Sequence, residues 1–150
     1  EAVESEKAPF EKHVDPSGII GIKTSTVKCE PFEQDGVALK DLVTLEEAPR
    51  MGAGVMELDH TSFEWTLTYD EYDMVIEGEL EIEIDGRIVR GGPGDIIYIP
   101  KGSHIHFQTL YPLCVLCLSC KLAGADLSSK GLVSKMDLLV LFVQGGLFLP

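Results

Sequence analysis

Positively charged residues are scarce in this chain. The 150 residues include 12 lysines and arginines against 25 aspartates and glutamates, and the formal net charge is −13. Proteins that bind nucleic acid or anionic membrane surfaces neutralise phosphates with clustered lysines and arginines, and the sequence contains no such cluster. We therefore expect neither nucleic acid nor a membrane as a partner.

Long apolar runs and an N-terminal signal are also missing. Even the apolar stretch from Leu138 to Leu149 is interrupted by Gln144-Gly145-Gly146, whereas a membrane-spanning helix needs about 18 or more apolar residues. The opening residues, EAVESEKAPFEK, lack the basic start and apolar stretch of a secretory signal. We expect a soluble, cytoplasmic protein. Because the first residue is Glu1 rather than methionine, we also expect a fragment or a processed chain.

The four cysteines do not form a metal-binding motif. Cys29 stands alone, while Cys114, Cys117 and Cys120 follow one another at spacings of three, with no second pair of ligands downstream. A structural zinc site with four ligands would have to recruit Cys29 or a distant histidine. The spacing therefore disfavours a structural zinc site.

The rest of the sequence is patterned for β-strands. Residues 1–17 mix charge with prolines and show no period, which predicts a flexible leader. Gly18–Val27 is rich in β-branched residues and is a candidate first strand. From Val37 onward, strand-like runs alternate with turn signals about every 8–12 residues, the spacing of an all-β barrel or sandwich. We predict one all-β domain over residues 18–118, with its core at 37–108.

One hairpin can be predicted in detail. In Glu79–Ile84, three glutamates alternate with three aliphatic residues, which gives a strand with one wet and one dry face. Asp85-Gly86 follows, a dipeptide suited to a type I′ turn, so Arg87–Val89 should return antiparallel. Strands this short need partners, which favours closure into a barrel.

Two motifs identify a family. Glu71 is followed after six residues by Gly78, and Gly94 after five residues by Pro100-Lys101-Gly102. These resemble the two motifs of the cupin superfamily. Within it, the stretch WTLTYDEYDMVIEGELEIEIDGRIVRGGPGDIIYIPKGSHIHF resembles the barrel of the ethanolamine-utilisation EutQ family in nearly every turn and strand. The resemblance covers about residues 17–108 and implies a single cupin (RmlC-like) β-barrel, or jelly roll.

The histidines that bind metal in most cupins are missing. Their first-motif positions hold Trp65 and Leu67, or Glu64 and Thr66. The second-motif position is Ile105, and the flanking His104 and His106 should face away from the barrel interior, because strand side chains alternate. EutQ members are known as cupins without this metal triad. We therefore expect no tightly bound transition metal.

Candidate site residues come from the run Tyr69–Asp73. Glu71 is the first candidate for a raised pKa, since burial in an apolar barrel disfavours its charged form. It is a candidate general base, or a weak candidate ligand for Mg²⁺ or Mn²⁺. The alternative is a buried glutamate bonded to Tyr69 or Tyr72 without a chemical role. The full set comprises Glu71, Tyr69 and Asp73 as catalytic candidates and Trp65, Glu57 and Tyr98 as ligand-binding candidates, although Trp65 is the kind of large aromatic that mainly packs a barrel wall.

The resemblance implies two functions. EutQ relatives have been described as acetate kinases, which move a phosphoryl group between ATP and acetate with a divalent metal, Mg²⁺ or Mn²⁺. The residues alone do not suggest this, because there is no G-x-x-x-x-G-K-[ST] motif and Arg87, Arg90 and Lys101 are the only cations near the barrel motifs. Any nucleotide site must be unconventional.

The second function implied is non-catalytic assembly of the bacterial microcompartment that processes ethanolamine. Its partners would be shell or enzyme components, and a homodimer is expected because cupins commonly pair through barrel strands. A metal-dependent isomerase or dioxygenase of ordinary cupin type is a third reading, which the missing imidazoles oppose.

The composition changes abruptly after about Gln108. Residues 109–150 contain Asp126 and Asp137 as their only acids, and the end, LLVLFVQGGLFLP, is apolar without a strand pattern. EutQ barrels end in a strand like YARFIYVTYPANW, which is absent as written. Reverse translation of Leu110–Ala123, read one base forward, permits YTRFVFYAYPANW. We predict a frameshift near Thr109, which makes residues 119–150 an atypical tail. The cysteine series would then result from translation in the wrong reading frame and would not be a metal site.

Independent sequencing of the source gene tests this prediction. We expect an inserted or deleted base close to the Thr109 codon, whereas an intact frame encoding the tail as given would contradict it. In either case residues Leu113–Leu118 are hydrophobic enough to take the position of the last barrel strand.

Overall fold

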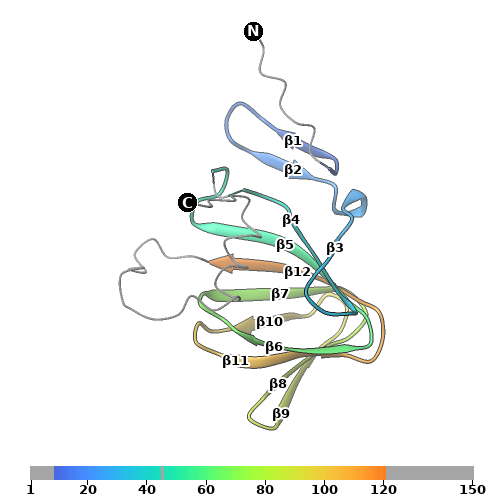
Figure 1. Cartoon of the computed structure of the whole chain (residues 1–150). Helices are drawn as coiled ribbons and strands as arrows, with labels where there is room; N and C mark the ends of the chain where they lie inside the picture. Colours follow the sequence, from blue (N-terminus) through green and yellow to red (C-terminus); the bar gives the residue numbers. More distant parts are fainter. Residues whose placement is uncertain (1–8, 45, 121–150) are drawn as a thin grey trace, which may run out of the picture.

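The computed structural model describes residues 9–44 and 46–120, and these are almost entirely β-structure (Figure 1). The prediction of an all-β barrel is confirmed. In this part of the chain no helix is long and apolar enough to cross a membrane. The elements are β1 (Lys12–Val14), β2 (Ile20–Ile22), η1 (Thr24–Thr26), β3 (Glu30–Pro31), β4 (Val37–Asp41), β5 (Met51–Leu58), β6 (Thr61–Thr66), β7 (Asp70–Glu77), β8 (Leu80–Ile84), β9 (Arg87–Gly91), β10 (Ile96–Ile99), β11 (His104–Thr109) and β12 (Leu113–Cys120).

Two sheets enclose the core. One has the strand order β10-β7-β12-β5-β4-β3 and the other β6-β11-β8-β9, and all pairings are antiparallel. Aliphatic residues from both sheets meet three aromatic rings inside, where Phe63 stacks on Phe107 at 5.2 Å and meets the edge of Trp65 at 6.2 Å between ring centroids. Burial of this apolar surface is the main source of stability.

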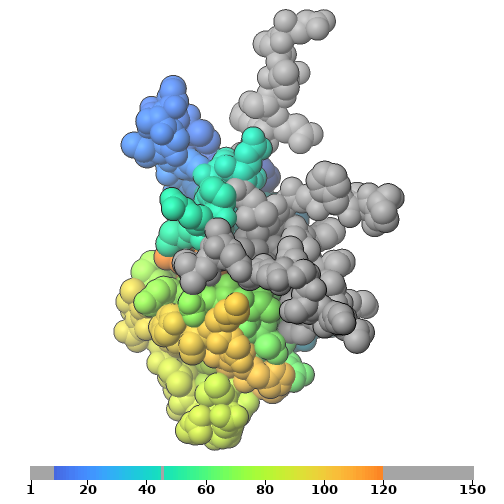
Figure 2. Space-filling view, turned by 90° about the vertical axis from the view of Figure 1, so that its left-hand side faces the viewer, coloured from blue at the N-terminus to red at the C-terminus, as the bar shows by residue number. Residues whose placement is uncertain are grey.

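The predicted hairpin is confirmed. Leu80 and Ile82 are buried, while Glu81 and Glu83 face outward, where Glu81 binds Arg90 at 2.7 Å. Asp85 and Gly86 have φ values of 50° and 76°, as a type I′ turn requires. The hairpin β8–β9 forms one end of the molecule (Figure 2).

Part of the predicted leader is ordered, and this corrects the sequence analysis. Residues 12–14 form β1 and pair with β2, whereas the candidate first strand at 18–27 shortens to β2 followed by η1. The turn between them is closed by the Gly18 and Asp15 backbone amides. Lys12 anchors the hairpin to the barrel, since its Nζ donates to the Leu42 carbonyl at 3.0 Å and to Glu47 at 2.6 Å. Local hydrogen bonding therefore orders a segment that shows no hydrophobic period.

Strand β12 lies at the centre of the six-stranded sheet, between β5 and β7 (Figure 1). Leu113 and Val115 point inward and are 4% and 0% exposed, so the segment 113–118 supplies the strand that closes the sheet. The predicted atypical tail lies, from residue 121 onward, outside the described residues.

The motif glycine Gly78 has a packing role. Its φ of +85° belongs to the left-handed region, which favours glycine. A Cβ there would collide with the Pro112 carbonyl oxygen and lie 2.9 Å from Leu113 Cα. Gly78 thus lets the turn after β7 pack directly against the start of β12, which sets the two strands that carry the site side by side.

Candidate functional site

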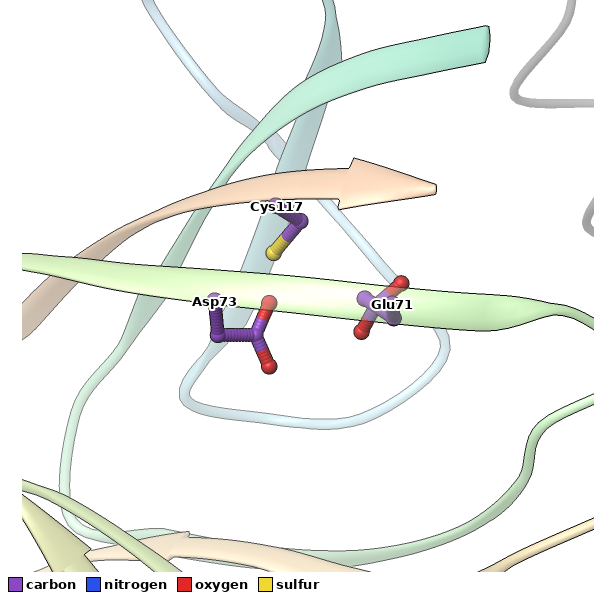
Figure 3. A group of neighbouring side chains, drawn as sticks. All are labelled: Glu71, Asp73 and Cys117. Carbon is purple, nitrogen blue, oxygen red and sulfur yellow. The ribbon is translucent and has the colours of Figure 1, made fainter. Parts of the chain in front are cut away.

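Two acidic side chains of β7 point into the barrel. Glu71 and Asp73 are two residues apart and therefore share a face of the strand, and they are 6% and 0% exposed. Figure 3 shows both carboxyl groups beneath β12. The sequence analysis predicted this pair as catalytic candidates, and the structure brings them together.

Cys117 completes the cluster. It lies on β12 directly opposite Asp73 in the strand register, and one ligand atom from each of Glu71, Asp73 and Cys117 lies within 4.8 Å of the others. Cys117 was not among the predicted site residues, because the cysteine series was explained as the product of a frameshift. A usable signal was present, since Leu113, Val115 and Cys117 follow the period of two that turns a strand face inward.

Burial changes the ionisation of this cluster. Loss of hydration raises the pKa of Asp73 to about 7 and that of Glu71 well above its ordinary value, and the nearby Asp73 charge raises that of Glu71 further. Burial likewise raises the pKa of Cys117. Within the described residues, neither carboxyl oxygen of Asp73 has a hydrogen-bond partner in good geometry, although the neighbouring Cys117 thiol and Glu71 carboxyl lie close enough to lower its pKa. In the absence of a cation the pair therefore retains a proton near neutral pH.

The cluster borders a small cavity of about 100 Å³. Glu71, Cys117, Tyr69 and Trp65 line it together with Lys40 of β4. Burial and the Glu71 charge both raise the pKa of Tyr69, so Tyr69 is a neutral hydroxyl donor beside Glu71. The predicted catalytic candidates Glu71 and Tyr69 and the ligand-binding candidate Trp65 thus share one cavity, with Asp73 directly behind.

Lys40 is the second residue that the sequence analysis missed. Its ammonium group lies 2.7 Å from Glu30, and its side chain is 19% exposed. The expected cations lie elsewhere: Arg87 and Arg90 pair with Asp85 and Glu81 on the β8–β9 hairpin. Lys40 lies opposite Val55, on the same face of the sheet as the exposed Glu57, so its ammonium group is on the outer face and only part of the residue borders the cavity.

Two predicted ligand-binding residues do not reach this cavity. Glu57 is exposed on the outer face, because it alternates with the inward Met56 and Leu58 of β5. Tyr98 is 50% exposed and donates a hydrogen bond to Asp70 at 3.0 Å. Neither side chain points into the barrel, and a ligand-binding role for Glu57 and Tyr98 stays a prediction.

The histidines face away from the barrel interior. Ile105 is 1% exposed inside the core. His104 lies 2.6 Å from Glu64, and His106 lies 3.1 Å from Glu83, both on the outer face. Histidine ligation inside the barrel is thus excluded for these two residues.

Comparisons with known proteins agree on one family. A family model described as "Ethanolamine utilisation protein EutQ" matches residues 1–115. The chain is 50% identical over 106 residues to a protein of Clostridioides difficile named "Acetate kinase EutQ", covering 66% of this chain and 68% of that protein. A Salmonella typhimurium protein of the same name is 45% identical over 95 residues, covering 61% of this chain.

Solved structures give the same result. The structure of the Clostridium difficile EutQ protein superimposes with a TM-score of 0.72 at 44% identity, covering 77% of this chain and 97% of that one. A cupin domain of Schizosaccharomyces pombe Cnp3, at 14% identity and a TM-score of 0.57, shares the fold. The chain spans only 42% of the Salmonella relative and 44% of an Escherichia coli relative.

The buried pair predicts a particular pH dependence of stability. A carboxyl whose pKa is raised in the folded chain contributes stability that is present at low pH and is lost as pH rises through the folded value. Between about pH 5 and about pH 7, unfolding free energy should fall by about 1.4 kcal/mol per pH unit for each such carboxyl. Asp73→Asn should remove one such contribution, as urea denaturation across this range will show.

The matched control is Glu79→Gln, which removes one carboxylate from an exposed position. It should keep the pH slope of the parent chain. Equal slopes for the parent chain and Asp73→Asn would contradict the proposed ionisation of the pair.

Proposed function

The chain belongs to the ethanolamine utilisation protein EutQ family, and from this premise we propose that it acts as an acetate kinase of bacterial ethanolamine catabolism. The observation that carries the proposal is a buried carboxyl pair beside a small cavity in a chain that is 50% identical to a relative named as that enzyme. The reaction would transfer the γ-phosphoryl group of ATP to an acetate oxygen and release ADP, or run in reverse.

The cavity suits the acetate half of this reaction. Its volume of about 100 Å³ accepts a molecule of acetate size, whereas drug-sized or cofactor-sized ligands need about 300–1,000 Å³. Tyr69 lines the cavity and its raised pKa keeps its hydroxyl neutral, so it would donate a hydrogen bond to an acetate oxygen. Trp65 and Phe107 in the cavity wall keep water away from the methyl group.

The nucleotide must then lie outside the barrel. A larger outer groove of about 550 Å³ is lined by Asp35, Glu57, Asp59 and Glu77, and these carboxylates would repel a bare triphosphate. We therefore place the ATP phosphates at the cavity entrance, with the adenosine on the surface. Glu57, as a residue of the outer groove, has no role in this arrangement.

A divalent cation fits the carboxyl pair. Asp73 has two buried oxygens without a hydrogen-bond partner in the described structure, and Glu71 lies beside it, so Mg²⁺ or Mn²⁺ would find oxygen ligands there. When bound, the ion neutralises phosphate charge during transfer. It would replace the proton that the pair otherwise holds, because carboxylate ligands bind metals in the deprotonated form.

The second candidate function is assembly within the ethanolamine microcompartment, in the cytoplasm. It is favoured by an apolar outer face on β7 and on β10, the edge strand of its sheet. Tyr72, Ile76, Ile96 and Tyr98 are each 42–62% exposed there, and the Tyr72 and Tyr98 rings lie 5.0 Å apart. Exposed apolar patches at a sheet edge mark interaction surfaces. We propose that this face forms a homodimer or contacts shell or enzyme components.

A coupled assay separates the two functions. ATP formation from acetyl phosphate and ADP with Mg²⁺ is measured for this chain, for Glu71→Gln, for the control Glu79→Gln, and for a chain carrying residues 110 onward in the alternative reading frame. We expect activity in the chain that carries the alternative reading frame. This activity should fall by about 100-fold or more when Glu71→Gln is added and should persist when Glu79→Gln is added.

Absence of activity in all of these chains would contradict the kinase and favour the assembly function. Sedimentation equilibrium then tests the interface. A mass of 16.4 kDa that does not change with concentration would exclude the homodimer, whereas a dimer lost on Ile96→Asp substitution would support it.

A further inference from the structure

We propose that Glu71, Asp73 and Cys117 form a site for a thiophilic divalent cation of the Zn²⁺ class. The site shares two carboxyls with the proposed kinase function but adds a sulfur ligand from β12, which that function does not use. It is the one cluster of three or more potential ligands found in the described residues.

The geometry brings the three ligand atoms to within reach of one ion. All lie within 4.8 Å of one another. Tetrahedral zinc with Zn–S of about 2.3 Å and Zn–O of about 2.1 Å separates its ligands by roughly 3.5 Å, so the atoms need to close by at most roughly 1.3 Å. Side-chain rotation alone supplies such a movement, because Asp73 and Cys117 already face each other across paired strands (Figure 3).

The unpartnered carboxyl of Asp73 is the second, independent indication. The side chain is fully buried, and no described donor lies in good hydrogen-bond geometry to either oxygen. The polar groups that lower its pKa are Cys117 and Glu71, the other two members of the cluster. A buried polar group without a partner costs free energy. One of its oxygens is directed toward the Cys117 sulfur (Figure 3), where a cation would supply the missing interaction.

The sulfur decides which class of cation is favoured. Mg²⁺ prefers oxygen ligands in octahedral geometry, whereas thiolate ligands select softer ions such as Zn²⁺. Three protein ligands leave a fourth position, as in catalytic zinc sites. The adjoining cavity of about 100 Å³ has room for water there, because one water needs about 10–15 Å³ of such volume.

In the alternative reading frame, the codons permit alanine at position 117. Cys117→Ala is therefore a natural test variant, which removes the thiol and keeps a small residue suited to the interior of β12.

Cobalt(II) is the probe for the experiment, because it replaces Zn²⁺ and absorbs light when bound to a thiolate. The reduced chain is titrated with CoCl₂ and followed by absorption. We expect a thiolate-to-cobalt charge-transfer band that Zn²⁺ displaces. The band should be lost in Cys117→Ala and should persist in the control Cys114→Ser. In Asp73→Asn, the cobalt concentration at which the band appears should rise by about tenfold or more.

Absence of the band in the parent chain would overturn the proposal. Persistence of the band in Cys117→Ala would also overturn it, provided that circular dichroism shows this variant to be a folded β-protein. A thermal shift with Zn²⁺ gives a second readout, since a ligand that binds the folded state raises its melting temperature. Both readouts are independent of phosphoryl transfer, so failure of the kinase assay leaves this inference standing, and the reverse also holds.

Discussion

Burial of two carboxyl groups on the inward face of β7 is the constraint on which the site depends. An apolar barrel disfavours charge, so Glu71 and Asp73 must hold a proton, bind a cation, or destabilise the fold. Glu71 is 6% exposed and Asp73 is 0% exposed, which places both among the buried residues of the described core. Each functional idea that fits the cavity, whether acetate binding or cation binding, is a way of satisfying this pair.

The same strands explain why a cupin without its histidines can still have a polar centre. In the second motif the inward position belongs to Ile105, and the two neighbouring histidines bond to outer-face glutamates. The polar groups enter from the other sheet instead, through β7 and β12. The fold is shared with a cupin domain, while the buried polar groups of this chain are carboxyl and thiol groups.

Much of the fold could be predicted from the alternation of inward and outward residues along each strand. The β8–β9 hairpin, the outward histidines and the inward Glu71–Asp73 pair could all be predicted, because alternation and turn chemistry are local properties of the sequence. Cys117 could not be placed in this way. Its approach to the site depends on the register of β12 against β7, which brings together residues far apart in the chain. The β1–β2 hairpin was missed for a different reason, since backbone bonds and Lys12 order it without a hydrophobic period.

Infrared spectroscopy of the metal-free chain tests the central claim most directly. Protonated carboxyl groups absorb apart from carboxylates, so their C=O band can be followed near neutral pH in the parent chain and in the two variants Glu71→Gln and Asp73→Asn. The account predicts a protonated-carboxyl band at neutral pH that weakens in either variant. A spectrum without this band, in a chain that remains folded, would show that both buried groups are ionised and would contradict the account.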